Sequence, residues 1–319
     1  MNIAIISYWH VHAEGYTKEI LEKTDSKVTA IWDEDRERGL RYATQFGAMF
    51  YDNYDELLLD KGIEGVVITA ATSEHTVLIR KAIRAGKKVF SEKVLALSSS
   101  DCLDIKEDLE QNNATLTLSL VKKCEPEFLF AKQLVSSGVL GRITYARMRN
   151  VHNGSIANWL PAHFYDLDQC GGGAMIDLGA HPMYLLNWLL GEPKTIQSVF
   201  TNITGHEVED NAVSVIEFDQ GAIGVSETGF VSVYNPATLE ISGTKGALLI
   251  RNGVLYATEE TNGQWITPEK LPQALPSPII QWAKVENTED DFGIEAAIML
   301  TKMMEAAYRS YHHGKKEEV

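Results

Sequence analysis

The first 120 residues alternate short apolar runs with segments of helical length, and this pattern limits the possible folds more than any other feature. The apolar runs cover residues 2–6, 28–32, 66–68, 88–91 and 115–120, and the helical segments cover residues 14–24, 38–46, 53–59, 73–85 and 101–109. The run over residues 66–68 is continuously β-branched, which is typical of a strand covered on both faces. Strands that alternate with helices in this way predict a doubly wound parallel sheet.

Residue types at the segment ends support these boundaries. Gly47 and Gly86 follow helical segments, where a glycine commonly ends a helix. Asn53, with Glu56 three residues later, resembles a capping box, and Ser73 is placed to cap the next helix.

The second half of the chain has a different pattern. After a helical segment over residues 126–138, residues 143–151 alternate with period two, as in a strand with two unlike faces. Further strands are expected at residues 195–204, 212–218, 222–230, 238–243, 247–251 and 254–257, followed by a final amphipathic helix over residues 292–312. Strands in succession without helices imply an antiparallel sheet. We therefore predict two domains, residues 1–121 and residues 122–319, with the option that the last helix packs back on the first domain.

Composition limits the class of partner. The chain has 319 residues and a net charge of −15, which argues against nucleic acid and anionic membranes as partners. No apolar stretch is long enough to span a bilayer, and the start is too short for a signal peptide. Cys102, Cys124 and Cys170 are odd in number and far apart, so they suggest neither disulfides nor a zinc pattern. We expect a cytoplasmic protein.

The segment from Gly171 to Gly191 is apolar on nearly every side, so it predicts one helix that is buried all round. Asp177 and His181 stand four residues apart within it and would share one helix face. Pro182 should kink this helix. A carboxylate beside an imidazole orients a histidine as a general base, and the alternative is a core ion pair without function.

The turn after the first strand, residues 7–12, lies at the edge where a doubly wound sheet binds ligands. A dinucleotide-binding turn has glycines at three positions, where this chain has Ser7, Trp9 and His12. Asp33 follows at the distance where an acid holds the adenosine ribose and repels a 2′-phosphate, which favours NAD over NADP. The alternative for Asp33 is that it caps the next helix.

Two pairs of residues and one loop are further candidates for ligand binding or catalysis. His10 and His12 either ligate a metal such as zinc or line the cleft as polar groups; since nothing else in the sequence completes an obvious ligand set, we predict no metal. Lys93 follows Glu92 at the end of a parallel strand, where its ammonium hydrogen-bonds a substrate hydroxyl unless it is a surface lysine. The loop over residues 152–170 is rich in aromatic and hydrogen-bonding side chains, and it is either a carbohydrate contact or an irregular connection.

Several stretches, taken in chain order, resemble signatures of one known family. They are the strand that ends at Asp33 and residues 70–75, 85–89, 92–93, 171–184, 243–246 and 305–310. Over almost its whole length, the chain resembles the Gfo/Idh/MocA oxidoreductases (glucose–fructose oxidoreductase, inositol dehydrogenase and rhizopine catabolism). The resemblance implies a Rossmann domain followed by an α+β domain with an open, mostly antiparallel sheet, whose face commonly makes an oligomer interface.

The resemblance also implies a nicotinamide cofactor, either NAD or NADP, and a sugar, cyclitol or related polyol as substrate. Lys93 matches the lysine of the family's Glu-Lys-Pro motif, and Asp177 and His181 match its Asp-x-x-x-His pair. We expect His181 to remove the hydroxyl proton, Asp177 to orient it, and Lys93 to hold the oxygen while hydride passes to the nicotinamide. The predicted cofactor contacts are Trp9, His10, Val11, Asp33, Ala70, Thr72, His75, Glu92 and Lys93, and the predicted substrate contacts are Lys93, Lys123, His152, Trp159, Asp177 and His181.

The chain departs from the family pattern at three places. The phosphate-loop glycines are missing, so the backbone cannot approach a pyrophosphate as closely. Val94 replaces the proline, and Tyr184 stands where many members carry an aspartate. A sugar-binding or regulatory protein with a degenerate nucleotide site is therefore the second hypothesis, and a metal hydrolase that uses His10 and His12 is the third.

Overall fold

The computed structural model describes residues 1–235, 237–285 and 289–319. The chain divides into two compact units, one built from Met1–Leu120 and Pro276–Thr301 and the other from Val121–Leu275 and Lys302–Val319. The first unit is therefore not continuous in sequence. Over the described ranges, no helix combines the length and the apolar character that crossing a membrane requires.

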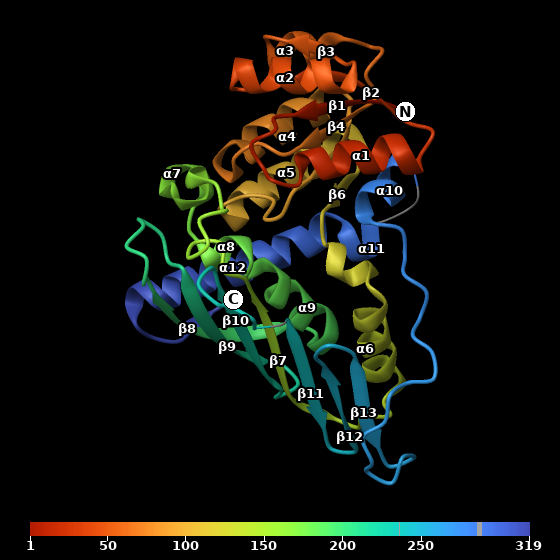
Figure 1. The fold of residues 1–319 in the computed structure, drawn as a ribbon, viewed down its shortest axis with the longest axis vertical. Coiled ribbons are helices and arrows are strands. Elements are labelled where there is room, and N and C mark those ends of the chain that lie inside the picture. Colours follow the sequence, from red (N-terminus) through yellow and green to blue (C-terminus); the bar gives the residue numbers. More distant parts are fainter. Residues whose placement is uncertain (236, 286–288) are drawn as a thin grey trace. The chain divides into compact units, whose positions relative to one another are not determined.

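In the described part of the first unit, a six-stranded sheet has the order β3-β2-β1-β4-β5-β6, and every neighbouring pair is parallel (Figure 1). Its strands are β1 (Asn2–Ile6), β2 (Lys27–Trp32), β3 (Met49–Tyr51), β4 (Gly65–Ile68), β5 (Lys88–Ser91) and β6 (Leu116–Leu118). The chain order reverses between β1 and β4, the place where doubly wound sheets bind ligands. The predicted parallel sheet is confirmed, although the short strand β3 was not predicted.

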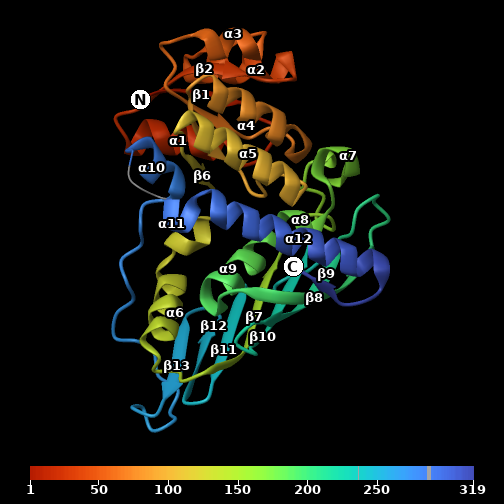
Figure 2. The same cartoon turned by 180° about the vertical axis from the view of Figure 1, so that it is seen from behind.

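Helices cover both faces of this sheet. They are α1 (Ala13–Lys23), α2 (Arg36–Phe46), α3 (Tyr54–Leu59), α4 (His75–Arg84), α5 (Ser99–Asn112), α10 (Pro278–Ala283) and α11 (Glu289–Phe292). One core cluster joins Ile3 and Phe90 of the sheet to Tyr16 of α1, Ala43 of α2 and Trp282 of α10. The reversed view shows α4 and α5 on the other face (Figure 2). Each large apolar side chain that is fully buried here contributes about 1.5–3 kcal/mol.

Local signals explain where several of these helices begin and end. Asn53 accepts hydrogen bonds from two backbone N–H groups in the first turn of α3, as a helix cap does. Gly47 ends α2 in the left-handed region, with φ of 67°. The prediction that Ser73 caps a helix is wrong, because a 3₁₀ turn over Thr72–Glu74 comes first and α4 begins at His75.

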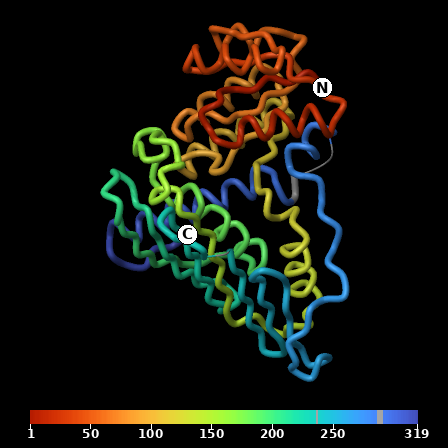
Figure 3. Tube along the Cα trace, viewed as in Figure 1, coloured from red at the N-terminus to blue at the C-terminus, as the bar shows by residue number. Residues whose placement is uncertain are grey.

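Helix α10, which comes late in the chain, packs against α1 near the N-terminus. Ser26 Oγ donates a hydrogen bond of 3.2 Å to Ala283 O. Figure 3 shows the blue trace of this helix beside the red trace of α1. A Cβ on Gly65 would lie 2.9 Å from the Trp282 ring, so the indole packs where only a glycine leaves room. This return of the chain was not predicted from the sequence.

The described part of the second unit contains an eight-stranded sheet in the order β13-β12-β11-β7-β10-β9-β8-β14. Its strands are β7 (Ile143–Val151), β8 (Pro193–Thr201), β9 (Asn211–Phe218), β10 (Ile223–Gly229), β11 (Thr238–Gly243), β12 (Gly246–Ile250), β13 (Val254–Thr258) and β14 (Glu317–Glu318). Neighbouring strands are antiparallel except β7 and β10, which run parallel. The prediction of a mostly antiparallel second sheet is confirmed.

One face of this sheet is covered by helices. The helices that follow β6 are α6 (Pro126–Ser137), α7 (Leu167–Cys170), α8 (Ala174–Asp177), α9 (Ala180–Leu190) and, near the end of the chain, α12 (Ile294–His313). Helices α8 and α9 pack on β7, β9 and β10. Along β9, Ala212 and Ile216 are buried, whereas Val213 and Val215 are exposed on the opposite face. The strand therefore has one covered side and one open apolar side.

The single buried helix predicted between Gly171 and Gly191 is wrong, because the structure has two helices there. Helix α8 ends at Asp177 and α9 begins at Ala180. Asp177 is therefore the last residue of one helix, and His181 lies in the first turn of the next.

Glycine and proline chemistry explains this break. A Cβ on Gly179 would overlap Met175 O, so the chain turns closely there only because the residue is a glycine. Pro182 then lies in the first turn of α9, where a missing N–H leaves no hydrogen bond unmade. The predicted kink within a continuous helix is therefore also wrong.

The turn before α8 depends on two further glycines. A Cβ on Gly172 would overlap Tyr308 Oη, and one on Gly173 would overlap Glu209 O. The Glu209 carboxylate accepts hydrogen bonds from Gly173 N (3.0 Å), Met175 N (2.9 Å) and Tyr308 Oη (2.7 Å). It therefore satisfies backbone donors at the start of α8. Burial raises the pKa of this carboxyl above its ordinary value, against the effect of these hydrogen bonds.

Candidate active site

The turn after β1 lies at the carboxyl edge of the parallel sheet. It begins at Ser7, whose φ of 72° lies in the region that favours glycine. Trp9 N–H donates to Ser7 Oγ (3.0 Å) and His10 N–H donates to Thr69 O (3.0 Å). The turn is thus held by hydrogen bonds to the protein itself. Of its side chains, Trp9 is buried and Val11 is exposed.

Glu92, directly after β5, is the centre of a buried polar cluster at the same edge. Its carboxylate accepts hydrogen bonds from Tyr16 Oη and from Lys93 N (2.9 Å), and its Oε1 lies 2.9 Å from His12 Nδ1. His10 Nδ1 is 3.8 Å from the same oxygen. Only 1% of the Glu92 side chain is exposed, so its charge is balanced inside the cluster and not by water.

The neighbours of Glu92 determine its ionisation. Burial opposes its ionised form, but the charges of His10, His12 and Lys93 outweigh burial and hold the pKa of the carboxyl well below its ordinary value. Burial and the Glu92 charge raise the pKa of Tyr16 well above its ordinary value. The cluster therefore joins an ionised acid to a neutral phenol that donates a hydrogen bond.

Asp33 follows β2 and is buried. Its oxygens accept hydrogen bonds from Tyr8 N (2.8 Å) and Asp35 N (2.8 Å), and Arg38 Nη2 lies 2.7 Å from Oδ1. Arg38 also pairs with Glu34 at 2.6 Å. The alternative that Asp33 caps the next helix is wrong, because the Asp35 side chain accepts the first N–H groups of α2. The ribose contact of Asp33 stays a prediction.

His75 joins two strand ends. Its Nδ1 lies 3.1 Å from Val94 O and its Nε2 lies 3.1 Å from Ala70 O, and burial lowers its pKa. The peptide bond between Lys93 and Val94 is cis, and the Lys93 side chain is buried. Thr72 opens the 3₁₀ turn before α4. Cofactor contacts by these residues stay predictions.

The backbone arrangement of the first unit matches that of domains that bind a nicotinamide dinucleotide. Its strand order, the start of α1 after β1 and the acid after β2 are those of a dinucleotide-binding sheet. Its turn differs, because backbone donors that a glycine-rich turn offers to a pyrophosphate bond the protein here. A bound dinucleotide would therefore depend on side chains at this edge more than on the turn backbone.

In the second unit, α9 holds His181 in a buried position. His181 Nδ1 lies 2.9 Å from Tyr184 Oη, one helical turn along. The backbone N–H of Lys122 donates to the same phenol oxygen at 3.1 Å. Tyr184 therefore orients the His181 ring, a role that sequence analysis missed when it marked the residue only as a departure from the family pattern.

Asp177 and two residues of the long loop lie in one neighbourhood. Burial lowers the pKa of His152, and the charge of Asp177 opposes that change. The His152 ring stacks on Phe230 with a centroid distance of 5.0 Å and lies 4.6 Å from the Trp159 ring. The structure thus brings together three of the residues predicted for substrate contact, Asp177, His152 and Trp159.

Two other polar residues of this unit have defined surroundings. Lys123 is buried in a 3₁₀ turn, with Nζ 5.7 Å from the centroid of the Trp188 ring. Its substrate contact stays a prediction. Burial, with the charge of Asp177 and other carboxylates, raises the pKa of Cys170 to about 12, so this thiol stays protonated and is not a nucleophile at neutral pH.

A surface cavity of about 560 Å³ adjoins His152. Amide side chains are its common feature, and they belong to Asn153, Asn235 and Asn252. Amides donate and accept hydrogen bonds without carrying charge. The cavity is therefore suited to hydroxyl groups.

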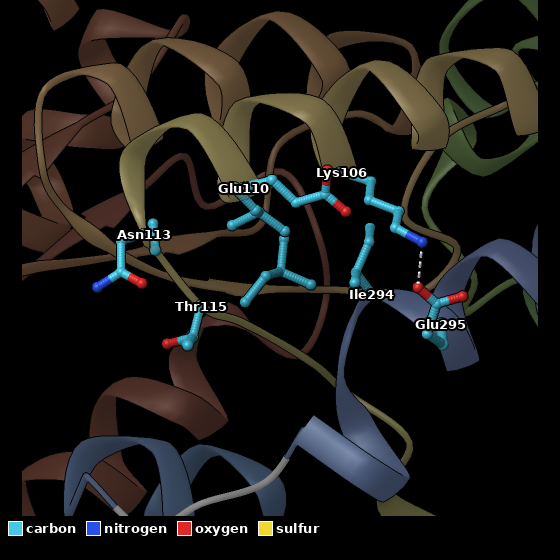
Figure 4. Close-up of a pocket in the computed structure, with 9 residues that line it drawn as sticks. Lys106, Glu110, Asn113, Thr115, Ile294 and Glu295 are labelled. Carbon is cyan, nitrogen blue, oxygen red and sulfur yellow. Dashed lines mark ion pairs between the residues drawn. The ribbon is translucent and has the colours of Figure 1, made fainter.

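A second cavity, of about 540 Å³, lies in the first unit among α5, β6 and the start of α12. Figure 4 shows Lys106 and Glu295 paired at one end of it, with an N–O distance of 2.6 Å. Its lining includes no residue predicted for catalysis or binding. We therefore assign it no part in the site.

Three polar residues at the edge of the parallel sheet were not predicted from the sequence. Tyr16 lies one helical turn after His12, so its spacing was an available signal. Arg38 and Ser119 reach the edge only through the packing of α2 and β6, for which the sequence carried no signal.

Two family models match this chain. Residues 1–120 match the model described as "Oxidoreductase family, NAD-binding Rossmann fold". Residues 128–249 match the "GFO/IDH/MocA C-terminal domain". The matched segments correspond to the parallel sheet of the first unit and to much of the sheet of the second.

Individual relatives agree with these matches. A scyllo-inositol 2-dehydrogenase (NAD(+)) of Bacillus subtilis is 29% identical over 234 residues, which cover 70% of this chain and 66% of that enzyme. A myo-inositol 2-dehydrogenase of Thermotoga maritima is 25% identical over 265 residues, which cover 78% of this chain and 75% of the enzyme. The solved structure of a levoglucosan dehydrogenase in complex with NADH has the same fold, with a TM-score of 0.86 and 18% identity over 100% of this chain and 99% of that one.

The fold and the polar edge of the parallel sheet thus define a dinucleotide-binding oxidoreductase with a second, mixed-sheet domain. The chain belongs to the Gfo/Idh/MocA family of oxidoreductases. The predicted family, NAD as the cofactor and the oxidoreductase class of enzyme are confirmed at the level of this family.

Proposed function

We propose that this protein catalyses the reversible oxidation of one hydroxyl group on a sugar, cyclitol or related polyol. The observation that carries the proposal is the buried imidazole of His181, which Tyr184 holds at Nδ1 (2.9 Å). Bound NAD supplies the hydride acceptor. The side chains of the protein bind the alcohol, orient it and move its proton.

His181 is the proposed general base. When Nδ1 carries the ring hydrogen and donates it to Tyr184 Oη, Nε2 keeps the lone pair that a base needs. The phenol is itself fixed by the N–H of Lys122. Asp177 is proposed to stabilise the imidazolium that forms when the hydroxyl proton is taken.

Lys93 is the proposed contact for the substrate oxygen. Its backbone N–H is fixed by Glu92 Oε2 at 2.9 Å, and its side chain is buried. An ammonium group stabilises the negative charge that develops on an oxygen as its proton leaves. This role matches the position of Lys93 at the carboxyl end of a parallel strand.

NAD, and not NADP, is the proposed physiological cofactor. Arg38 is the cation beside Asp33, and both Asp33 (2.7 Å) and Glu34 (2.6 Å) pair with it. Two carboxylates against one guanidinium leave a surplus of negative charge that repels a 2′-phosphate. The side chains and backbone proposed to contact the dinucleotide are those of Trp9, His10, Val11, Asp33, Ala70, Thr72, His75, Glu92 and Lys93.

An uncharged polyol is the proposed substrate, with Lys123, His152 and Trp159 among its contacts. Burial favours the neutral imidazole of His152, which offers hydrogen bonds without a net charge. The indole of Trp159 is 53% exposed and presents an apolar face to the C–H groups of a sugar. The adjoining cavity of about 560 Å³ supports a substrate whose hydroxyls extend beyond the reacting carbon.

The cellular setting and assembly belong to the same proposal. The proposed cofactor domain is residues 1–121 together with the returning residues 276–301, and the proposed substrate domain is the rest of residues 122–319. Val199, Val213 and Val215 are exposed on the open face of the second sheet, which supports a homo-oligomer through that face. The net charge of −15 supports a cytoplasmic protein that binds neither nucleic acid nor membranes.

A substrate screen tests the proposal. NADH formation is measured with cyclitols, aldoses and sugar acids, with NAD⁺ and NADP⁺ as cofactors, and saturable turnover is expected with NAD⁺ and at least one neutral polyol. His181→Ala and Lys93→Met should each lower kcat by roughly 10²–10⁴-fold. NADH affinity, measured by fluorescence titration, should stay nearly unchanged in His181→Ala and fall only modestly in Lys93→Met, because Lys93 is one of several proposed cofactor contacts. Lost NADH binding in either variant would contradict the assigned roles.

A non-catalytic sugar-binding or regulatory protein is the second function to test. The observation that favours it is the turn after β1, whose N–H groups bond the protein. It predicts that NADH gives no saturable fluorescence signal although a polyol still binds. A saturable NADH signal with turnover excludes it.

A further inference from the structure

Three potential metal ligands meet at the carboxyl edge of the parallel sheet. The ligand atoms of His10, His12 and Glu92 all lie within 4.8 Å of one another. We propose that they form a binding site for one divalent transition-metal ion of the zinc type. The proposal concerns the cofactor-free protein and does not depend on the proposed dehydrogenase activity.

The donor set suits such an ion. Two imidazoles and one carboxylate are ligands that zinc accepts, at about 2.0–2.2 Å from the metal. A tetrahedral centre with such bonds separates its ligand atoms by about 3.3 Å. The observed separations from Glu92 Oε1 are 2.9 Å to His12 Nδ1 and 3.8 Å to His10 Nδ1, which lie on either side of that value. Small rotations of the two rings therefore complete the geometry.

Neighbouring groups hold the carboxylate in place for this role. Tyr16 Oη donates to Glu92 Oε1 and lies 2.6 Å from Ser119 Oγ, while Lys93 N–H donates to Oε2 at 2.9 Å. Outer hydrogen bonds of this kind fix the orientation of metal ligands. They leave Oε1 as the carboxylate oxygen that faces both imidazoles.

The cluster also has an entry path. The His12 side chain is 49% exposed, whereas those of His10 and Glu92 are buried. A metal held by three protein ligands keeps a fourth position for water or for an anionic oxygen. In the absence of metal, the backbone N–H of His12 donates a hydrogen bond to His10 Nδ1 (3.2 Å), and His12 Nδ1 shares a proton with Glu92 Oε1. A bound ion takes the place of both of these hydrogens.

The location indicates what such an ion would do. The cluster lies beside the turn that lacks glycines and whose N–H groups bond the protein. A divalent cation there supplies positive charge to the diphosphate class of ligand that this edge of the sheet binds. Sequence analysis left the two histidines without a third ligand, and the fold supplies it from Glu92, 80 residues further along the chain.

Zinc titration of the metal-free, cofactor-free protein tests the proposal. Isothermal titration with Zn²⁺ should show one ion per chain, and Co²⁺ should give the visible absorption of a four-coordinate site. His12→Ala and Glu92→Gln should each weaken Zn²⁺ binding by roughly a hundredfold, and Tyr16→Phe by about tenfold. His312→Ala, which removes an exposed histidine of α12, is the matched control and should bind like the unmodified protein.

Three results would overturn the proposal. They are the absence of stoichiometric Zn²⁺ binding, binding that His12→Ala and Glu92→Gln leave unchanged, and equal loss in the His312→Ala control. NADH titration and the NADH-formation assay, each with and without saturating Zn²⁺, separate this proposal from the enzymatic one. A metal site without catalysis, or catalysis without a metal site, is then recognised directly.

Discussion

The two polar clusters of this protein balance their polar groups in different ways. Around Glu92, a buried carboxylate is ionised and is held by the side chains of His12 and Tyr16. In the second unit, His181 lies 2.9 Å from the phenol oxygen of Tyr184, and burial lowers the pKa of His152, whose ring packs on Phe230 and Trp159. The first cluster concentrates charge in a buried place, and the second surrounds imidazoles with aromatic groups.

This difference teaches what kind of ligand each cluster suits. A dense set of charged and titratable groups binds ionic ligands, because the free-energy cost of removing a charged ligand from water is offset only by an opposite charge in the site. Neutral imidazole, indole and amide groups match an uncharged polyol, whose recognition depends on hydrogen bonds and apolar faces. The following four predictions test this contrast.

The largest effect is expected from the turn that supports the second cluster. Gly173→Ala places a Cβ against Glu209 O and should lower the free energy of unfolding by about 3 kcal/mol, measured by chemical denaturation. Gly15→Ala in α1 is the matched control, because an added Cβ there meets no atom within 4 Å. The control should gain up to about 1 kcal/mol from helix propensity. Similar stabilities for the two variants would show that the turn tolerates a side chain.

The next effect concerns the positioning of His181. Tyr184→Phe removes the hydroxyl that holds Nδ1, and one such hydrogen bond contributes about 0.5–1.5 kcal/mol, so kcat should fall by up to about tenfold. The pH dependence of kcat should shift, while KM and NADH affinity change little. Tyr311→Phe, on the exposed side of α12, is the control. An unaltered pH profile in Tyr184→Phe would assign the phenol a structural role alone.

The third prediction concerns pH and the Glu209 carboxyl. Burial raises its pKa in the folded state, so its contribution to stability is fully present below the unfolded pKa and is lost as pH rises through the folded pKa. Glu209→Gln removes this pH-dependent loss of stability, because the amide of glutamine does not ionise. The stability of the variant relative to the unmodified protein should therefore increase between about pH 4 and pH 7, by at most about 1.4 kcal/mol per pH unit.

Denaturation at several pH values measures this difference. Glu207→Gln, which changes an exposed acid two residues earlier, is the matched control and should show no such increase. A constant difference between Glu209→Gln and the unmodified protein across this range would mean that Glu209 titrates alike in the folded and unfolded chain.

The smallest effect is expected at the cofactor edge of the first unit. Glu34→Gln removes one of the two carboxylates that neutralise Arg38, and an exposed pair of this type is worth about 0.2–1 kcal/mol. The preference for NADH over NADPH should narrow by about twofold to fivefold in fluorescence titrations. Glu37→Gln, an exposed acid of α2, controls for the loss of one charge. Equal narrowing in both variants would exclude a specific effect of Arg38.

Much of the fold was predictable because its signals are local. Apolar runs marked β1, β2, β4 and β5, helical patterns marked the helices between them, and period two marked β7. Asn53 and Gly47 mark helix ends where the structure has them. Strand β3 was missed because a three-residue strand is too short to show a period. The return of α10 to the first unit was missed because its packing on α1 joins residues far apart in sequence.

The candidate site was predictable only in part. Asp177 and His181 stood out as polar residues in an apolar segment, but the break at Gly179 arises from a close approach to Met175 that spacing alone does not reveal. The partner of His181 is Tyr184, whose hydroxyl was not recognised as a polar group facing the ring. The alternative that Asp33 caps the next helix is wrong because Asp35 makes that cap.

The sequence by itself determined the two sheets, most element boundaries, the family and the identity of the residues that carry chemical groups, because these follow from periodicity, propensity and local motifs. Only the tertiary structure decided which distant groups meet: Glu92 with two histidines 80 or more residues away, Tyr16 with Ser119, and Tyr184 with the N–H of Lys122. Distances across strands and helices depend on how distant segments pack. Such packing is a property of the whole chain, which no local pattern encodes.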